Sequence, residues 1–404
     1  MSAPYRILYH HRIRADDGQA VHVREVIGAL RGLGHEVAEC ALVPKTERAA
    51  ANVGAGAAAT ATKPGFWQRL SLPRSAIEVL EILYDRKGRP MLRERARSLR
   101  PHFVYERHAL HCRAGLDVAR ELGVPLLLEV NSPMVAEMAK LGSLRFAARA
   151  RRTERAVLES ADAVLAVTHV LADLLVEAGA RRERVHVIGN AAEPARYGHA
   201  ARAAAAEVRR RLTLRDGAFV VGFVGYMRPW HRLDLVIDVM TRPELRDVVL
   251  VLMGRGPALQ PLLELANARG VGDRVRALGE VPPDLLPAHQ LACDLALIPA
   301  INEYASPLKL FDALAAGVPA LAPDQPNLRE VITDGATGLL FARENAEALA
   351  VQLGRCVRDR AFAARVGAAG RDLLERERYT WAGNAERIVK VYEAIAATGP
   401  RAAR

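Results

Sequence analysis

Short apolar segments alternate with stretches of helical spacing along this whole chain, and the alternation begins a second time near its middle. In the first half, the segments that predict strands are Arg6–Tyr9, Glu36–Leu42, Phe103–Glu106, Pro125–Val130, Ala163–Val167 and Val185–Ile188. In the second half they are Phe219–Gly225, Val248–Met253, Val275–Ala277, Leu295–Pro299 and Pro319–Ala322. Helical spacing occurs between them, for example in Val21–Gly32, Arg113–Leu122, Ala258–Arg269 and Pro307–Ala316. This order predicts βαβ units and parallel sheets covered on both faces.

The second start, at "AFVVGFVG", predicts two domains in a chain of 404 residues, which is long for one core. A polar, Ala- and Arg-rich stretch from about Glu193 to Arg215 precedes it. We expect an N-terminal domain over residues 1–192 and a C-terminal domain over residues 193–382. Each would be a doubly wound, Rossmann-like α/β sheet that binds ligands near the carboxyl ends of its strands, and a larger ligand would occupy a cleft between the two. The Ala-rich insert Ala49–Gly65 is expected to be a mobile surface loop.

Composition narrows the class of partner. The formal charge is +11, nearly all of the excess from Arg. This is typical either of an Arg- and Ala-rich genome or of a protein with an anionic partner such as a nucleotide, an acidic glycan or a membrane surface. Aromatic residues are 5% and are not interleaved with basic ones, which disfavours stacking on single-stranded nucleic acid, and no nucleic-acid partner is expected. The four cysteines have no CxxC spacing and are expected to be isolated buried thiols. With no signal peptide and no apolar run long enough for a membrane span, we expect a cytoplasmic protein.

The segment "EYASPLKLFDALAAGVPALAP" predicts an anion site at the start of a helix. Ser306 is a good N-cap and Pro307 suits the first helical position. The free backbone N–H groups of Leu308 and Lys309 would then point toward a ligand, together with the helix dipole and the Lys309 ammonium. The alternative is that Ser-Pro only caps a core helix whose charges are solvated.

Two carboxylates flank this helix start. Asp312 lies three residues beyond Lys309, on the same face, where it could accept hydrogen bonds from ribose hydroxyls. Glu303 lies on the loop before the helix and could reach a sugar hydroxyl.

"GFVGYMRPWHRLDLVIDVM" suggests a second anion site. Gly225 ends a strand, and the loop that follows carries Arg228, which is permanently charged, and His231, which binds a phosphate as a donor or when protonated. Gly254, in "MGRGP", marks a third strand-to-turn at the same edge. The alternative is a surface Arg and a His at a helix start.

In order and spacing, "FVGYMRPWHRLDLVID", "LVLMGRGP", "EYASPLKLFDALAAGVPALAP" and "EVITDGATGLLF" resemble the second half of family 4 of the glycosyltransferases. "ILYHHRIRADDGQAVHVREVIGALRGLGHEV", "VYERHALHCRAGLDVARELGVPLLLEVNSP" and "ADAVLAVTHVLADLLVEAGARRERVHVIGNAAEPARY" are similar to its first half. The resemblance covers nearly the whole chain except the insert, and it implies the GT-B fold. It also implies retaining transfer of a sugar from a nucleotide-sugar, usually without a metal or another cofactor.

The resemblance implies roles for particular residues. Leu308, Lys309 and Arg228 would hold the donor diphosphate, and Asp312 would bind the ribose. Gly18 would let the first-domain loop approach the donor or acceptor closely. The C-terminal helix, within residues 383–404, would cross back to the first domain and tether a closing hinge.

The sequence departs from the family pattern at several positions. Tyr226 stands where a positive residue usually follows the strand-ending glycine, so Arg228 would substitute for it. His231 replaces a usual Lys, and the usual histidine after the fourth strand is Asn131, which can still bind a sugar hydroxyl. Glu303 and Asp312 have eight residues between them instead of seven, and Asp17-Gly18 replaces a common pair of glycines.

The acceptor is expected on the first domain, where Arg107 and His108 leave a strand in "YERHALH". His108 and His111 have the spacing of a metal pair, but no carboxylate or Cys completes a set in the sequence, so no metal is expected. The Arg-rich segment Arg86–Arg100 and the stripe Arg145/Arg149/Arg152 are either solvated helix faces or a peripheral contact to anionic lipid or a lipid-linked acceptor.

Two other functions remain open at this point. A GT-B-fold epimerase would act on the nucleotide-sugar without an acceptor. A non-catalytic subunit would keep the fold while the motifs drift.

Overall fold

The computed structural model describes residues 4–46 and 74–398, so the predicted insert loop Ala49–Gly65 lies outside the described residues. Contacts divide the chain into two units of similar size. Unit 1 comprises Met1–Gly189 with Trp381–Arg404, and unit 2 comprises Asn190–Thr380.

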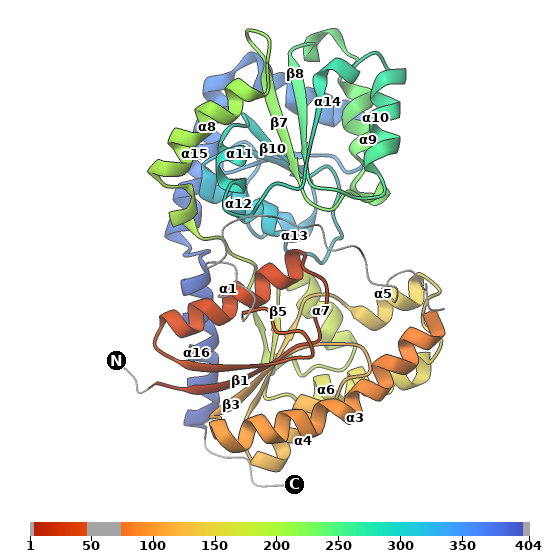
Figure 1. The fold of residues 1–404 in the computed structure, drawn as a ribbon, viewed down its shortest axis with the longest axis vertical. Helices are drawn as coiled ribbons and strands as arrows, with labels where there is room; N and C mark the ends of the chain where they lie inside the picture. The colour runs from red at the N-terminus through yellow and green to blue at the C-terminus, as the bar shows by residue number, and fades with distance from the viewer. Residues whose placement is uncertain (1–3, 47–73, 399–404) are drawn as a thin grey trace, which may run out of the picture. The chain divides into compact units, whose positions relative to one another are not determined.

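Unit 1 contains a sheet of six parallel strands in the order β2-β1-β3-β4-β5-β6 (Figure 1). The strands are β1 (Arg6–His10), β2 (Glu36–Cys40), β3 (Phe103–Arg107), β4 (Leu126–Val130), β5 (Ala163–Ala166) and β6 (Val185–Val187). All six are predicted from the sequence, with bounds that differ by two residues at most. The strand order reverses between β1 and β3, so their carboxyl ends form the topological switch point of this sheet.

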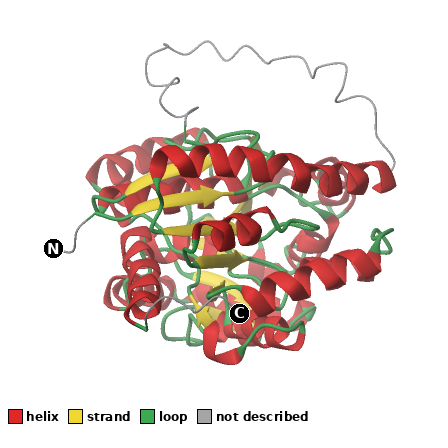
Figure 2. Ribbon diagram, turned by 90° about the horizontal axis from the view of Figure 1, so that it is seen from below, coloured by secondary structure: helices red, strands yellow, loops and turns green. Residues whose placement is uncertain are grey.

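Helices cover both faces of the unit 1 sheet, as Figure 2 shows. The α-helices of this unit are α1 (Gly18–Gly32), α3 (Arg74–Leu99), α4 (Ala114–Leu122), α5 (Met134–Lys140), α6 (Ala147–Ser160), α7 (His169–Glu177) and α16 (Trp381–Ala397). The C-terminal helix α16 packs against α1. The ring centroids of Trp381, in α16, and His22, in α1, lie 5.3 Å apart in an edge-to-face arrangement. Two segments far apart in sequence therefore share one layer of unit 1.

Unit 2 repeats this architecture with a sheet in the order β12-β11-β10-β7-β8-β9. The strands are β7 (Phe219–Val224), β8 (Val248–Met253), β9 (Val275–Gly279), β10 (Leu295–Leu297), β11 (Ala320–Pro323) and β12 (Leu339–Phe341). All neighbouring pairs are parallel. The sequence predicts all but β12, whose three residues are too few to show a period. The switch point lies between β7 and β10.

The helices of unit 2 cover its sheet and include the Ala- and Arg-rich stretch before β7. The α-helices are α8 (His199–Arg211), α9 (Leu233–Val239), α10 (Leu259–Ala268), α11 (Leu286–Leu291), α12 (Leu308–Ala316), α13 (Pro326–Arg329), α14 (Ala346–Arg358) and α15 (Arg360–Arg376). Helix α8 packs against α11. The Ala- and Arg-rich stretch before β7 therefore contains an α-helix that belongs to unit 2.

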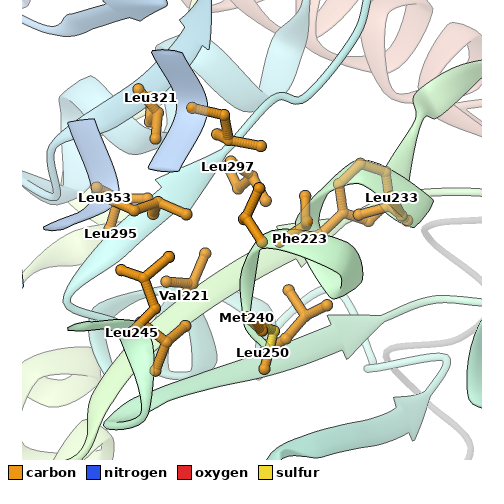
Figure 3. Close-up of a cluster of buried hydrophobic side chains, with 14 of the residues drawn as sticks. Val221, Phe223, Leu233, Met240, Leu245, Leu250, Leu295, Leu297, Leu321 and Leu353 are labelled. Carbon is orange, nitrogen blue, oxygen red and sulfur yellow. The ribbon is translucent and has the colours of Figure 1, made fainter. Parts of the chain in front are cut away.

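Strand β8 shows why the central strands read as continuous apolar runs. Its residues 248, 250 and 252 pack into one core cluster, and residues 249, 251 and 253 pack into a second one. Alternate side chains point to opposite faces, and both faces of a parallel sheet are buried. Figure 3 shows the first cluster, in which Val221 and Phe223 of β7 lie among leucines of neighbouring strands and helices.

Two general expectations concern the described residues. All four cysteines, Cys40, Cys112, Cys293 and Cys356, are free and buried, which confirms the prediction made from their spacing. Within the ranges 4–46 and 74–398, every helix is too short or too polar to cross a bilayer.

Candidate functional site

The strongest candidate site lies at the switch point of unit 2, where the loops after β7 and β10 leave the sheet. Gly225 follows β7, and the chain after β10 leads into α12. Ligands of doubly wound sheets bind at this position because the strand order reverses and leaves a crevice between two loops. The predicted residues Gly225, Arg228, His231 and Lys309 all belong to these two connections.

Lys309, in the first turn of α12, extends over the end of β7. Its Nζ lies 4.1 Å from the centroid of the Phe223 ring. Burial lowers the pKa of Lys309 from 10.5 to about 7. No carboxylate in the described parts of the chain pairs with this ammonium. A half-buried cation without a counterion is unfavourable unless a ligand supplies the negative charge.

His231 and Arg228 lie beside this lysine. The His231 Nδ1 accepts a hydrogen bond from the Arg228 backbone N–H at 3.1 Å, and the imidazole meets the Phe223 ring edge-on at 5.2 Å. Burial, with the nearby charges of Lys309 and Arg228, lowers the pKa of His231 to about 3. His231 is therefore neutral at physiological pH, and its Nε2–H is a donor because Nδ1 already accepts.

Arg228 is exposed and has a stacking partner but no counterion. Its guanidinium lies 5.1 Å from the centroid of the Tyr226 ring, which is itself 46% exposed. Among the residues that the structure describes, no carboxylate pairs with Arg228. Arg228 and Lys309 thus place two uncompensated cations close to one neutral donor, which is an arrangement suited to a diphosphate.

Glycines allow the loops at this edge to pack closely. Gly225 has φ of +139°, and a Cβ there would lie 3.5 Å from the Lys309 Nζ. Gly254, after β8, has φ of +131°, and a Cβ there would lie 2.1 Å from the Gly225 carbonyl oxygen. Gly254, predicted as a donor-binding residue, therefore supports the loop that carries Gly225.

The start of α12 corrects one prediction. The structure places the helix at Leu308–Ala316 with Pro307 at the N-cap, so helix assignment begins one residue after the predicted start. Ser306 is not the cap, because its hydroxyl accepts a hydrogen bond from the Asn190 backbone N–H at 2.9 Å. Its carbonyl also accepts from the Asn190 side chain. The N–H groups of Leu308 and Lys309, at the first two helical positions, have no partner inside the helix.

The two predicted carboxylates lie in different surroundings. Asp312 is beside the hydroxyl of Tyr197, and burial with this carboxylate raises the pKa of Tyr197. Glu303 is exposed and forms an ion pair with Arg343, which follows β12. Sequence reasoning did not find Arg343 as a partner, because 40 residues separate the two.

In unit 1, the predicted residues lie around a buried carboxylate that sequence reasoning did not single out. Glu129, in β4, is 3% exposed. It accepts hydrogen bonds from the Tyr105 hydroxyl at 2.7 Å and from the Asn131 side chain at 2.5 Å, and it pairs with Arg107. The His22 Nε2 lies 3.1 Å away. Burial alone would raise the pKa of Glu129, but His22, Arg107 and the hydrogen bonds outweigh it and hold that pKa well below its usual range.

The other predicted residues of unit 1 have separate positions. Gly18 is the first residue of α1, whose N-cap is Asp17, with the carboxylate accepting from Gln19. The His108 Nε2 lies 3.5 Å from a Glu154 carboxylate oxygen without a hydrogen bond.

His108 and His111, which have the spacing of a metal pair, do not share one site. The His111 Nε2 bonds Glu78 at 2.9 Å, whereas His108 faces Glu154. In the described residues, His10, Glu106 and Cys112 bring donor atoms within 4.8 Å of one another. However, the His10 Nδ1 and a Glu106 oxygen are already hydrogen bonded at 2.5 Å, and the same oxygen accepts from the Gly115 N–H at 2.8 Å. These contacts give the group a hydrogen-bonding role.

Comparisons with known proteins identify the family. The profile "Glycosyl transferase 4-like domain" matches residues 17–191, and "Glycosyl transferases group 1" matches residues 205–373. The D-inositol 3-phosphate glycosyltransferase of Nocardia farcinica is 30% identical over 318 residues, which cover 75% of this chain and 69% of the relative.

Two solved structures share the fold. Anabaena HepE in complex with UDP-glucose has a TM-score of 0.69 at 17% identity and covers 96% of this chain and 100% of its own. Sucrose-phosphate synthase from Thermosynechococcus elongatus has a TM-score of 0.73 at 18% identity and covers 98% and 100%.

The chain therefore belongs to family 4 of the glycosyltransferases. Its two six-stranded parallel sheets with flanking helices have the GT-B fold. The predictions of family, fold class and glycosyltransferase activity are confirmed.

Proposed function

We propose that this glycosyltransferase transfers a sugar from a nucleotide-sugar to an acceptor hydroxyl with retention of anomeric configuration, and that unit 2 binds the donor. The observation that carries the proposal is the pair of uncompensated cations, Arg228 and Lys309, at the switch point of unit 2. The likeness of the fold to that of HepE with UDP-glucose supports a nucleotide-sugar donor.

The two cations would act on the leaving group. As the bond between the anomeric carbon and the diphosphate oxygen breaks, its electron pair passes to that oxygen, and negative charge grows on the diphosphate. Arg228, Lys309 and the N–H groups that begin α12 would stabilise that charge, which is the largest kind of catalytic contribution at such sites. The neutral His231 would donate one hydrogen bond from Nε2.

Retention is proposed through attack on the same face of the sugar. The acceptor oxygen forms the new bond to the anomeric carbon while its proton passes to an oxygen of the departing diphosphate. This route needs no carboxylate nucleophile and no metal. Trapping of a covalent glycosyl-enzyme would contradict it.

The remaining donor contacts are assigned by position. Asp312 is proposed for the ribose hydroxyls, and its aspartate length requires a close approach. Glu303, held by Arg343, is proposed for a sugar hydroxyl. Tyr226, exposed beside Arg228, is proposed to border the donor.

The acceptor is proposed to bind unit 1. Asn131 donates its side-chain N–H to Glu129, and this leaves its carbonyl oxygen as an acceptor for a sugar or polyol hydroxyl. His108 is the second candidate, since its Nε2 lacks a hydrogen bond. Arg107 would act by holding Glu129.

The acceptor class remains a glycan, a lipid-linked molecule or a small molecule. A small phosphorylated polyol has support from the relative named for D-inositol 3-phosphate. A cytoplasmic location, with peripheral contact to anionic lipid through Arg86–Arg100, is proposed on the basis of its charge and the free cysteines.

The test is a thermal-shift panel of nucleoside diphosphates, followed by product analysis with the nucleotide-sugar of the preferred base. One base should stabilise the protein by about 2.7 kcal/mol at a hundred times its dissociation constant. Release of sugar with retained configuration, to water or an added acceptor, supports the proposal. An epimerised nucleotide-sugar, or no stabilisation by any base, contradicts it.

A further inference from the structure

A groove of about 720 Å³ lies on the helical layer of unit 1, between α3, α4 and α6. Its lining is almost entirely charged. The lining residues are Asp85, Arg89, Arg113, Asp117, Arg120, Glu121, Arg149, Arg152 and Thr153. Five arginines thus face three carboxylates, and the distribution of ion pairs decides what this groove can bind.

Two of the carboxylates, Asp85 and Asp117, are paired with two of the arginines. Asp85 accepts from an Arg89 Nη at 2.9 Å and from the Arg113 backbone N–H at 2.6 Å. Asp117 lies 2.7 Å from Arg89 and 3.4 Å from Arg113. The Nε groups of both arginines are buried without a hydrogen-bond partner, so donors exceed acceptors even here.

The third carboxylate, Glu121, is not paired with an arginine of the groove. Glu121 binds Arg93, which lies outside the lining, through two hydrogen bonds of 2.6 and 2.5 Å. Arg120 donates to a serine hydroxyl, a neutral partner, at 2.8 Å. In the described part of the chain, Arg149 and Arg152 have neither an ion pair nor a side-chain hydrogen bond. Three of the five lining arginines therefore lack a carboxylate.

Arg149 and Arg152 are three positions apart on α6 and so project from the same face of the helix. Planar guanidinium groups bind phosphate oxygens through paired hydrogen bonds. A concave site with unbalanced positive charge also concentrates anions. The volume is within the range of small-molecule sites.

We propose that this groove binds a phosphate-bearing anion, with Arg149, Arg152 and Arg120 as the ligands of the phosphate. The site is made by helices rather than by the strand ends, so it is separate from the proposed donor site. A free phosphorylated molecule and the headgroup of an anionic lipid share the required chemistry.

The test uses inorganic pyrophosphate and mass-spectrometric mapping of arginine modification by phenylglyoxal on the whole protein. Pyrophosphate should slow modification of Arg149 and Arg152 but not of Arg151 and Arg181, which are exposed and do not line the groove. Because the mapping is residue by residue, binding of pyrophosphate at the donor site does not confuse the result.

The variant R149Q/R152Q should bind pyrophosphate at this site at least about tenfold more weakly, which is the loss expected for a charge-assisted hydrogen bond. The matched control R151Q/R181Q removes the same charge from exposed positions outside the groove and should bind normally. A parallel arm replaces pyrophosphate with phosphatidylglycerol vesicles and measures sedimentation. Selective loss of vesicle binding in R149Q/R152Q would identify the headgroup as the source and support the site. The proposal would be overturned if both variants lost binding equally. It would also be overturned if pyrophosphate gave no protection and the vesicles did not bind.

Discussion

The two sheets have the same parallel architecture, but the charged side chains near the carboxyl ends of their strands differ. In unit 1 they pair with one another, whereas in the described residues of unit 2 two cations lack a counterion. In unit 1, His10 at the end of β1 bonds Glu106 of β3, and Arg107 of β3 pairs with Glu129 of β4. In unit 2, Lys309 and Arg228 are left without counterions in the described residues.

Charged residues are therefore expected to contribute to stability in unit 1 and to ligand binding in unit 2. A buried ion pair that is closed on itself holds its side chains in one arrangement, and removal of either partner is costly. A half-buried cation without a counterion, such as Lys309, makes the folded protein less stable, and it gains a partner only when an anion binds. Unit 1 should therefore respond to charge removal in its folding, and unit 2 should respond in its ligand affinity.

The largest expected effect is on the stability of unit 1. Glu129→Gln keeps the shape of the side chain but leaves Arg107 buried without its carboxylate. Loss of one partner of a buried ion pair should lower the free energy of unfolding by about 4 kcal/mol. Hydrogen exchange measured by mass spectrometry checks this, since peptides of β3 and β4 should lose protection while those of β7 and β8 do not.

The matched control for this prediction is Glu121→Gln. Glu121 pairs with Arg93 at the surface, and loss of an exposed pair should change stability far less than loss of the buried one, because water screens it. If Glu129→Gln changed hydrogen exchange no more than Glu121→Gln does, the buried network would not be what stabilises unit 1.

The Glu129 network also shows that contacts between distant strands are not predicted from the sequence. The sequence predicts β3 and β4 because their apolar runs have the length of strands. It does not predict that Arg107 and Glu129 are paired in register across them. A signal existed, since a basic residue ends one buried strand and an acidic residue lies near the end of the next. Ser306 failed as a cap for a similar reason, because its partner Asn190 is 116 residues away.

The charged and polar residues of the unit 2 site, in contrast, could be predicted from the local sequence. Arg228, His231 and Lys309 follow predicted strands, and parallel strands bring their carboxyl ends to one edge. The sequence could not show that the Phe223 ring lies under both His231 and Lys309, nor that neither cation has a counterion among the described residues. Those facts come from packing between segments far apart in the chain.

The second prediction concerns ligand affinity in unit 2. Lys309→Gln should weaken binding of the preferred nucleoside diphosphate by about 3 kcal/mol, roughly a hundredfold or more. The ligand-free protein should be as stable as the wild type or more stable, because a half-buried cation without a counterion has been removed. Calorimetric titration and unfolding of the ligand-free protein measure the two effects.

Arg365→Gln is the control for Lys309→Gln, since Arg365 is an exposed cation on α15. It should leave affinity unchanged. Equal weakening in both variants would indicate a general effect of charge rather than a site at the switch point.

The third prediction tests the glycine that supports the site. Gly254→Ala places a methyl group 2.1 Å from the Gly225 carbonyl oxygen at a φ of +131°, so the loops after β7 and β8 must separate. The expected cost is about 2 kcal/mol of stability, with weaker diphosphate binding. Gly28→Ala, inside α1, adds a methyl group that meets no heavy atom within 4 Å beyond its neighbours and the backbone of its own helix, and should instead stabilise the protein by up to about 1 kcal/mol. Hydrogen exchange of both units distinguishes the two outcomes.

The smallest effect is a pH dependence that reports on Lys309 directly. Burial lowers the pKa of Lys309 to about 7, whereas burial and the neighbouring cations lower the pKa of His231 to about 3, so Lys309 alone of the two titrates near neutral pH. Above pH 7 the free protein holds Lys309 mostly neutral. A bound diphosphate favours the charged form and raises this pKa, so binding takes up a proton.

Affinity for the nucleotide-sugar should therefore fall as pH rises above about 7, by at most tenfold per pH unit. Without ligand the sign is reversed, because the unfolded chain binds this proton up to its ordinary pKa of 10.5, and Lys309 makes unit 2 more stable as pH rises from about 7 toward that value. Calorimetry in buffers of different ionisation enthalpy measures the proton uptake between about pH 6 and pH 9. In Lys309→Gln the uptake should disappear. If it persisted there, another group would carry the proton, and the contrast between the two strand edges would rest on Arg228 alone.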